Sequence, residues 1–123
     1  MSAADPRIDT GSDSGPIDLD HLARMTCGES ALQREVLGLF LAQSGRLITA
    51  LADASAKVAT ISHTLKGSAK AVGAFDVAER AAALEEAALK GSDPAPSLGE
   101  LKAAVAKASG AIEALLKAPD RAA

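Results

Sequence analysis

Apolar residues recur every three or four positions over long stretches of this chain, and this spacing constrains the fold more than any other feature. The clearest case is the stripe of Val58, Ile61, Leu65, Ala69 and Val72, which lies on one face of a helix. Alanine and leucine must do most of the packing, because 48% of residues are hydrophobic but only 2% are aromatic. Both residues favour helix, so the pattern predicts an all-α protein.

Capping signals divide the chain into one short helix and four long ones. Two capping boxes, in which a serine is followed three residues later by Gln or Glu, predict that long helices open at Ser30 and at Ser97. Gly73 and Gly91 suit the position after a helix, and Pro119 ends the last one. The predicted short helix lies within residues 17–28, and the predicted long helices cover residues 30–54, 55–72, 75–90 and 97–117.

The short helix is expected to begin at Asp18, which suits an N-cap, and to stop at Gly28. In the second helix we expect a bend near Gly45 and a mainly apolar side formed by Leu32, Val36, Leu39, Phe40, Ile48 and Leu51. Short connections between long helices favour antiparallel neighbours. The predicted fold is an antiparallel four-helix bundle with a short additional N-terminal helix.

Residues 1–15 are rich in Asp, Ser, Gly and Ala and lack periodic apolar positions. We therefore expect a disordered tail there, followed by one domain over residues 16–118. The tail has no apolar segment of the kind found in signal peptides, and no apolar run approaches the roughly 20 residues that span a bilayer. The expectation is a stand-alone cytoplasmic monomer without a membrane partner, rather than a piece of a larger kinase.

The charges and the few metal-binding side chains exclude several classes of function. The 13 basic and 16 acidic residues give a formal net charge of −3, whereas nucleic-acid binders usually carry a basic surplus. Cys27 is the single cysteine, so no internal disulfide or cysteine-cluster metal site is expected, and its side chain is expected to be buried or half-buried. His21 and His63 lie far apart in sequence, so no zinc site is expected; His21 is predicted at a helix surface or partly packed.

His63 lies about 200° around the helix from Ile61, so it points away from the apolar stripe. Lys66, Gly67 and Lys70 follow it at three, four and seven positions, on the same outer face. The group offers a nucleophilic imidazole, positive charge for a phosphoryl group with Lys70 acting at longer range, and space beside Gly67 for another protein's backbone. The same spacing also fits a solvated helix face without chemistry, and the residues alone leave both interpretations open.

The stretch HTLKGSAKAVGA, residues 63–74, resembles the signature of the histidine-containing phosphotransfer (HPt) family, approximately His-x-Leu-Lys-Gly-Ser-Ser/Ala with a glycine further on. The flanking helices are similar as well, so the resemblance covers about residues 16–117. It implies an antiparallel four-helix bundle in which His63 accepts a phosphoryl group from a receiver-domain aspartate and passes it to another receiver domain in two-component signalling. Lys66 would offset phosphate charge and Gly67 would give access.

The resemblance also implies a polar side chain on the next helix that hydrogen-bonds the ring nitrogen that is not phosphorylated. Counting along the motif places Glu85 there, where it would hold Nδ1–H and leave Nε2 as the nucleophile. The alternative role of Glu85 is a surface acid paired with a nearby lysine. The docking rim is expected to contain Thr60, Thr64, Gly67 and Ala71, with apolar patches from the short leading helix.

The chain has neither a Gly-rich nucleotide loop nor a Walker-type GxxxxGK[S/T] motif. Autophosphorylation from ATP is therefore not expected, nor is any cofactor of the protein itself; Mg²⁺ is expected only in the partner receiver domain. The alternative function is a docking module that binds and inhibits or scaffolds a receiver domain or histidine kinase without carrying phosphate. A hydrolase is the least expected class, because an outward histidine on a helical bundle provides no pocket.

Overall fold

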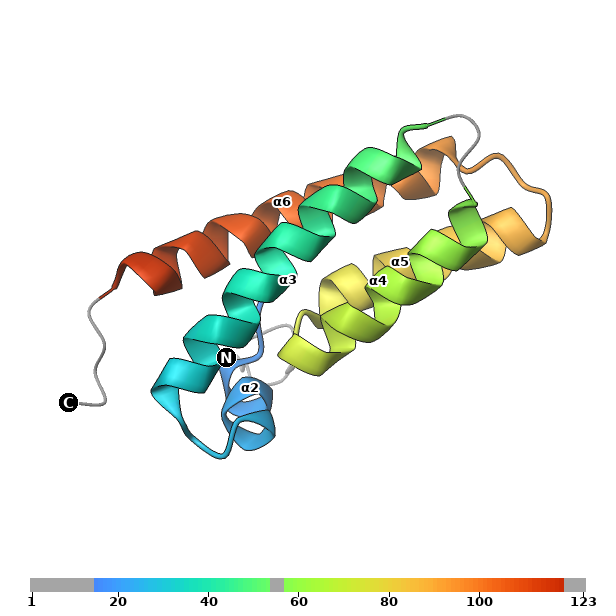
Figure 1. Cartoon of the computed structure of the whole chain (residues 1–123). Helices are drawn as coiled ribbons and strands as arrows, with labels where there is room; N and C mark the ends of the chain where they lie inside the picture. The colour runs from blue at the N-terminus through green and yellow to red at the C-terminus, as the bar shows by residue number, and fades with distance from the viewer. Residues whose placement is uncertain (1–14, 54–56, 119–123) are drawn as a thin grey trace, which may run out of the picture.

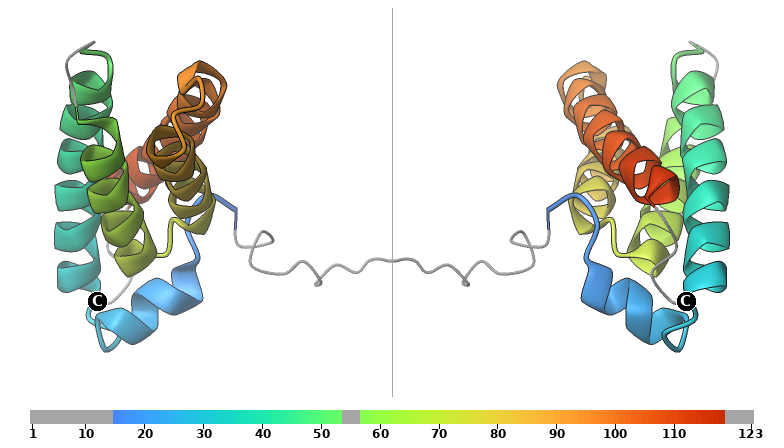
Figure 2. Two further views of the ribbon diagram at one scale, coloured as in Figure 1. Left: turned by 90° about the vertical axis from the view of Figure 1, so that its right-hand side faces the viewer. Right: turned by 90° about the vertical axis from the view of Figure 1, so that its left-hand side faces the viewer.

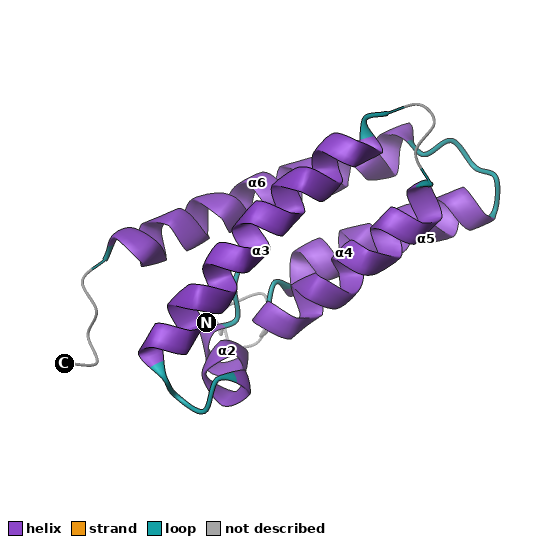
Figure 3. Cartoon of the chain, in the orientation of Figure 1, coloured by secondary structure: helices purple, strands orange, loops and turns teal. Residues whose placement is uncertain are grey.

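The structure, a computed structural model, describes residues 15–53 and 57–118, and helices are the regular elements of these ranges (Figure 3). They are α2 (Leu19–Met25), α3 (Ser30–Leu51), α4 (Val58–Val72), α5 (Phe75–Leu89) and α6 (Ala95–Lys117). The predicted all-α class is confirmed. The predicted disordered tail lies, apart from Gly15, outside the described residues.

The four long helices run antiparallel and close into a ring. In that ring α3 packs against α4 and α6, and α5 packs against the same two helices (Figure 1). The short turn between α4 and α5 and the loop between α5 and α6 favour this arrangement, because they leave no room for a crossover. The short helix α2 lies across one end of the bundle and contacts α4 (Figure 2). The architecture is the predicted four-helix bundle with an additional N-terminal helix.

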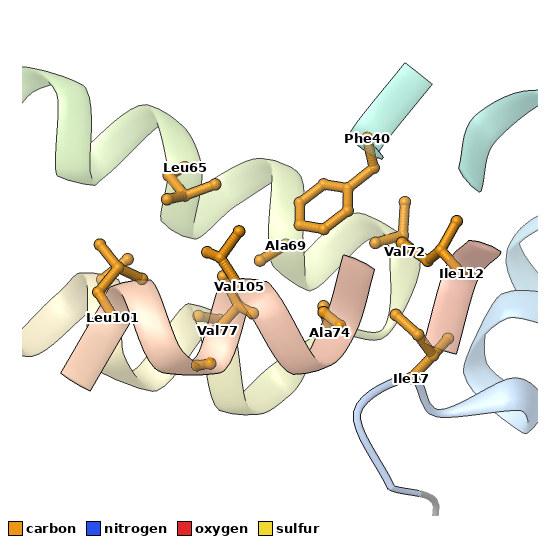
Figure 4. Packing of buried hydrophobic residues seen from close by; sticks show 14 of the residues in the cluster. Ile17, Phe40, Leu65, Ala69, Val72, Ala74, Val77, Leu101, Val105 and Ile112 are labelled. Carbon is orange, nitrogen blue, oxygen red and sulfur yellow. The ribbon is translucent and has the colours of Figure 1, made fainter. Parts of the chain in front are cut away.

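Leucine, isoleucine, valine and alanine fill the core, together with one aromatic ring. Leu65 of α4 and Leu101 and Ile112 of α6 are fully buried, and Phe40 reaches in from α3 (Figure 4). Burial of one leucine side chain stabilises the folded state by about 1.5–3 kcal/mol. Ala69, also fully buried, keeps α4 close to its neighbours. The core therefore fixes which face of α4 is turned outward.

The predicted apolar stripe of α4 forms part of this core. Leu65, Ala69 and Val72 are buried, while Val58 and Ile61 are partly buried and pack against the buried cluster. The stripe prediction is confirmed, because a fifteen-residue helix with this spacing has only one face that can be covered by its neighbours.

Gly73 ends α4 and ties α2 to the turn between α4 and α5. Its φ of 83° lies in the left-handed region, and a Cβ there would come within 2.7 Å of the Asp18 carbonyl oxygen, so only glycine fits. The Gly73 carbonyl accepts a hydrogen bond of 2.8 Å from the Asp18 amide. The Asp18 carboxylate in turn accepts from the His21 amide, as predicted for an N-cap. This contact sets where α5 begins relative to α4.

Arg34 joins α3 to the end of α6. Its guanidinium donates to the carbonyl oxygens of Leu115 (3.3 Å), Leu116 and Ala118 (3.4 Å). The last carbonyls of a helix have no partner within the helix and favour a nearby cation. Arg34 therefore stabilises the end of α6, and it marks the side of α3 that faces α6.

α3 begins at Ser30, as predicted, but neither predicted serine is the N-cap. The N-cap of α3 is Glu29, so Ser30 is its first helical residue, and α6 begins at Ala95, before Ser97. Pro96 lies in the first turn of α6, where a missing N–H costs no helix hydrogen bond. Pro94, the N-cap, and Pro96 therefore both lie at the start of the helix.

The facing ends of α3 and α4 also differ from the predicted bounds. α3 ends at Leu51 rather than at residue 54, and α4 begins at Val58 rather than at residue 55. Residues 54–56, where the predicted ends fall, lie outside the described residues. The backbone of α3 stays helical through Gly45, and α3 is one continuous helix in Figure 1.

The apolar-side prediction is wrong for two leucines of α3, because Leu32 and Leu39 are exposed, Leu39 to 64%. The buried residues of α3, from Leu37 to Leu51, span an arc of about 60° of the helix, and Leu39 lies about 100° outside that arc, beyond Phe40. The prediction for Cys27 is also wrong. Its side chain is exposed, because the residue stands in the turn between α2 and α3 rather than on an apolar helix face.

Candidate functional site

His63 projects from the outer face of α4, opposite the buried stripe. Its side chain is 66% exposed, whereas Leu65 and Ala69 on the opposite face have no exposed surface. Gly67, one turn further along, is exposed, and a Cβ placed on it would meet nothing within 4 Å. An accessible imidazole with open space beside it is the arrangement that the helix spacing predicts.

Glu85 reaches His63 from the neighbouring helix α5. One carboxylate oxygen, Oε2, lies 3.0 Å from His63 Nδ1, and the other, Oε1, lies 2.9 Å from Lys66 Nζ. The Glu85 side chain is only 19% exposed and that of Lys66 25%. One carboxylate thus bridges the imidazole and the ammonium group, and partial burial holds the bridge in place.

The charge on Glu85 decides which nitrogen of His63 carries the proton. The hydrogen bond from Lys66 is the main cause that lowers the pKa of Glu85; the hydrogen bond with His63 lowers it further, while partial burial opposes both. An ionised carboxylate can only accept hydrogen bonds. Nδ1 must therefore be the donor, and in the neutral ring Nε2 keeps a free lone pair.

The Lys66 ammonium, which the resemblance implies would offset phosphate charge, is paired in the structure with the Glu85 carboxylate. Both contacts predicted as alternatives for Glu85 are present, since its carboxylate binds the His63 ring nitrogen and also pairs with Lys66. The sequence signal for this pairing was weak: Lys66 follows His63 at i+3, which puts both within reach of one group on a neighbouring helix.

The remaining predicted residues lie around His63 on the exposed surface of α4. Thr60, Thr64, Lys70 and Ala71 are all exposed. The Thr64 hydroxyl donates to the Thr60 carbonyl at 3.1 Å, so it is used within the helix. Lys70 forms no ion pair with any residue that the structure describes, and its ammonium stays available to a partner.

The second histidine takes no part in this site. The ring of His21, on α2, packs edge-on against Phe75, with ring centroids 5.0 Å apart, which matches the predicted partly packed position. Its Nε2 is buried without a hydrogen-bond partner among the described residues. Over residues 15–53 and 57–118 no group of three or more His, Cys, Asp or Glu side chains is placed to hold a metal ion.

A family comparison agrees with the motif and with the bundle. A sequence model of the Hpt domain matches residues 35–120, which is most of the chain. The chain belongs to the Hpt domain family. Searches among curated proteins and among solved structures gave no match.

Membership of this family places the protein in two-component phosphorelay signalling. Hpt domains are phosphotransfer modules rather than kinases with an ATP site, and they interact with receiver domains. None of the helices in the described ranges is long and apolar enough to cross a membrane.

Proposed function

We propose that this protein is a phosphorelay intermediate in which His63 accepts a phosphoryl group from the aspartyl phosphate of one receiver domain and passes it to an aspartate of another. The observation that carries the proposal is the hydrogen bond of 3.0 Å between His63 Nδ1 and Glu85. It orients an otherwise exposed ring and leaves Nε2 as the attacking atom. A histidine on a merely solvated helix face has no need of such a partner.

The transfer step is a nucleophilic displacement at phosphorus. The lone pair of Nε2 attacks the phosphorus atom of the aspartyl phosphate, a P–N bond forms, and the bond from phosphorus to the aspartate oxygen breaks. The aspartate leaves as a carboxylate with the bonding electrons, and the proton on Nδ1 stays in place. In the second transfer a carboxylate oxygen of another receiver attacks the phosphohistidine, and Nε2 leaves with its lone pair restored.

Glu85 and Lys66 each offset an unfavourable charge that this step creates. Attack by Nε2 makes the ring cationic, and the Glu85 carboxylate on Nδ1–H stabilises that charge. A bare carboxylate would also repel the incoming phosphoryl group. Lys66, 2.9 Å from the same carboxylate, offsets this repulsion, since opposite charges at that separation largely cancel at a distance.

The remaining parts of the reaction come from the partner. We propose that Mg²⁺ is held by the receiver domain, that the open space beside Gly67 admits the receiver's backbone, and that the protein works as a cytoplasmic monomer. Lys70, exposed on the same helix face, adds positive charge near the phosphoryl group at longer range.

Intact-mass spectrometry at mildly alkaline pH tests the proposal. The protein and its His63→Gln variant are each mixed with phosphorylated receiver domains from the same organism and Mg²⁺. The expected result is one acid-labile phosphoryl adduct in the wild type and none in the variant. Binding to receivers without any adduct would contradict the carrier function and leave the docking module that inhibits or scaffolds its partner.

A further inference from the structure

Ser62, the residue before His63, is fully buried, and its hydroxyl has no partner. The Oγ atom makes no hydrogen bond with any residue that the structure describes. A buried hydroxyl without a partner destabilises a fold, and an alanine would occupy the same place without that cost. The position of this small side chain, rather than its hydrogen bonding, therefore needs an explanation.

Ser62 lies on the flank of α4 that faces α5. It stands about 40° around the helix from Lys66, between that residue and the apolar stripe, and Lys66 reaches across to Glu85. Ser62 lies eleven residues before Gly73, and Glu85 lies eleven residues after Ala74. Because α4 and α5 run antiparallel from this turn (Figure 1), Ser62 and Glu85 stand at the same level of the two helices.

Small side chains line the facing flanks of α4 and α5. The buried ones are Ser62, Ala69, Ala78 and Ala81. Among the described helices this pair packs together most extensively, because the side chains at a contact set the distance between two helices. The close approach lets the partly buried Glu85 side chain reach His63 and Lys66 at once, at 3.0 and 2.9 Å.

On the basis of the proposed function, we propose that Ser62 is a positioning residue whose small size keeps Glu85 within reach of His63. It acts through Glu85 and does not itself contact the phosphoryl group. A larger side chain at this level pushes α5 away from α4, and the Glu85 carboxylate then loses its hydrogen bond with Nδ1. The ring proton is no longer held on Nδ1, and it can move to Nε2, the attacking atom.

Three variants separate size, hydrogen bonding and stability. Ser62→Val enlarges the side chain, whereas Ser62→Ala removes only the hydroxyl. Ser44→Val is the matched control, because Ser44 is equally buried but belongs to α3, which packs against α4 and α6. An overpacked core destabilises the fold at either place, so only an effect on His63 distinguishes the two valine variants.

The first readout is the tautomer of the neutral His63 ring, measured by nitrogen NMR. We expect the wild type, Ser62→Ala and Ser44→Val to keep the proton on Nδ1, and Ser62→Val to carry it largely on Nε2, as Glu85→Ala should.

The second readout is the rate of His63 labelling by phosphoramidate, a small phosphoryl donor that needs no docking. Ser62→Val should slow labelling about tenfold, as for loss of a group that positions a histidine. Combined with Glu85→Ala it should cause no further loss, because both substitutions remove the same contact.

Several outcomes contradict the inference. An unchanged tautomer in Ser62→Val shows that size at this position does not place Glu85. An equal change in Ser62→Ala assigns the effect to the hydroxyl, and an equal change in Ser44→Val assigns it to core packing in general. If Ser62→Val does not fold, Ser62→Thr, which adds a single methyl group, replaces it, and an unchanged tautomer there also contradicts the inference.

Failure of the proposed function gives a different result. A wild-type protein that keeps the proton on Nδ1, but that neither phosphoramidate nor a phosphorylated receiver labels, contradicts the carrier function. The tautomer of Ser62→Val then still decides whether Ser62 positions Glu85, since this readout needs no phosphoryl transfer.

Discussion

The two helices that build the site differ in charge. α4 carries two lysines and no acidic residue, whereas α5 carries Asp76, Glu79, Glu85 and Glu86 against one arginine. α4 supplies His63, the proposed phosphoryl acceptor, and α5 supplies the carboxylate that hydrogen-bonds its ring. The neighbouring Glu86 of α5 pairs with Lys90, the C-cap of the same helix, at 2.8 Å, while Glu85 pairs across to α4.

The difference shows what makes one of two adjacent acids functional. Glu85 and Glu86 are chemically identical, and the pKa of each is lowered chiefly by a hydrogen bond from a lysine. Their positions about 100° apart around α5 turn Glu85 toward α4 and Glu86 toward solvent. Helix packing, rather than residue type, therefore selects the group that acts on His63.

The largest effect on the rate of phosphoryl transfer is expected at Gly67, beside the exposed ring of His63. Gly67→Gln places a side chain beside His63 and should slow transfer from a receiver about a hundredfold, since each 1.4 kcal/mol of lost docking energy is about tenfold. Gly110→Gln is the matched control, because Gly110 is an exposed glycine of α6 whose Cβ position is also open. Circular dichroism should show both variants folded. An unchanged transfer rate in Gly67→Gln would contradict the proposal that the space beside Gly67 admits the receiver's backbone.

A smaller loss of transfer rate is expected when the Glu85 carboxylate, which binds the His63 ring, is removed. Glu85→Ala should slow transfer about tenfold, in the range found when a group that positions a histidine is lost. It should slow labelling by phosphoramidate as well, because the defect lies in the nucleophile rather than in docking. Glu86→Ala, at the adjacent acid, should leave both rates unchanged. If the two variants behave alike, the bridge seen in the structure has no role in transfer.

The two lysines of α4 are expected to affect the transfer rate to different extents in the same assay. Lys66→Gln removes the partner of Glu85 and is expected to slow transfer about threefold, as for loss of a partly exposed charge pair. Lys70→Gln removes only a longer-range charge and should have a smaller effect, which disappears in high salt because exposed charges are screened. A larger effect of Lys70→Gln would show that direct contact with the phosphoryl group outweighs the pairing with Glu85.

The smallest effect is a dependence of stability on pH. The pKa of Glu85 in the folded state lies below its usual 4.5, so its pairing stabilises the fold above that pH and is lost as the pH falls through the lower folded pKa. The Tm difference between the wild type and Lys66→Gln should therefore narrow below pH 4.5. Lys70→Gln serves as the control without such narrowing. A difference that stays constant down to pH 3 would contradict the assignment.

Much of the site could be predicted from local pattern. The outward direction of His63 follows from its angle to Leu65 on a regular helix, and regular helices keep that angle whatever surrounds them. The stop at Gly73 follows from the left-handed conformation that glycine alone adopts easily. The motif around His63 was enough to indicate the family, since it occupies consecutive positions.

Local sequence patterns do not predict two other features of the fold. Leu39 fits the apolar spacing of α3 as well as Val36 does, yet only Val36 packs against the core. The choice depends on how far α4 and α6 wrap around α3. The start of α6 at Ala95 rather than at Ser97 was missed because a proline indicates a loop or a first turn equally well.

The helical class, the core face of α4 and the exposed group of His63, Gly67 and Lys70 follow from helical periodicity alone. The bridge that Glu85 forms to both His63 and Lys66, which precede it by 22 and 19 residues, depends instead on how α5 packs against α4. That contact depends on the turn at Gly73, held by Asp18, which sets the register of α5 against α4. A shift of one residue would rotate Glu85 by about 100°, away from the imidazole that it orients.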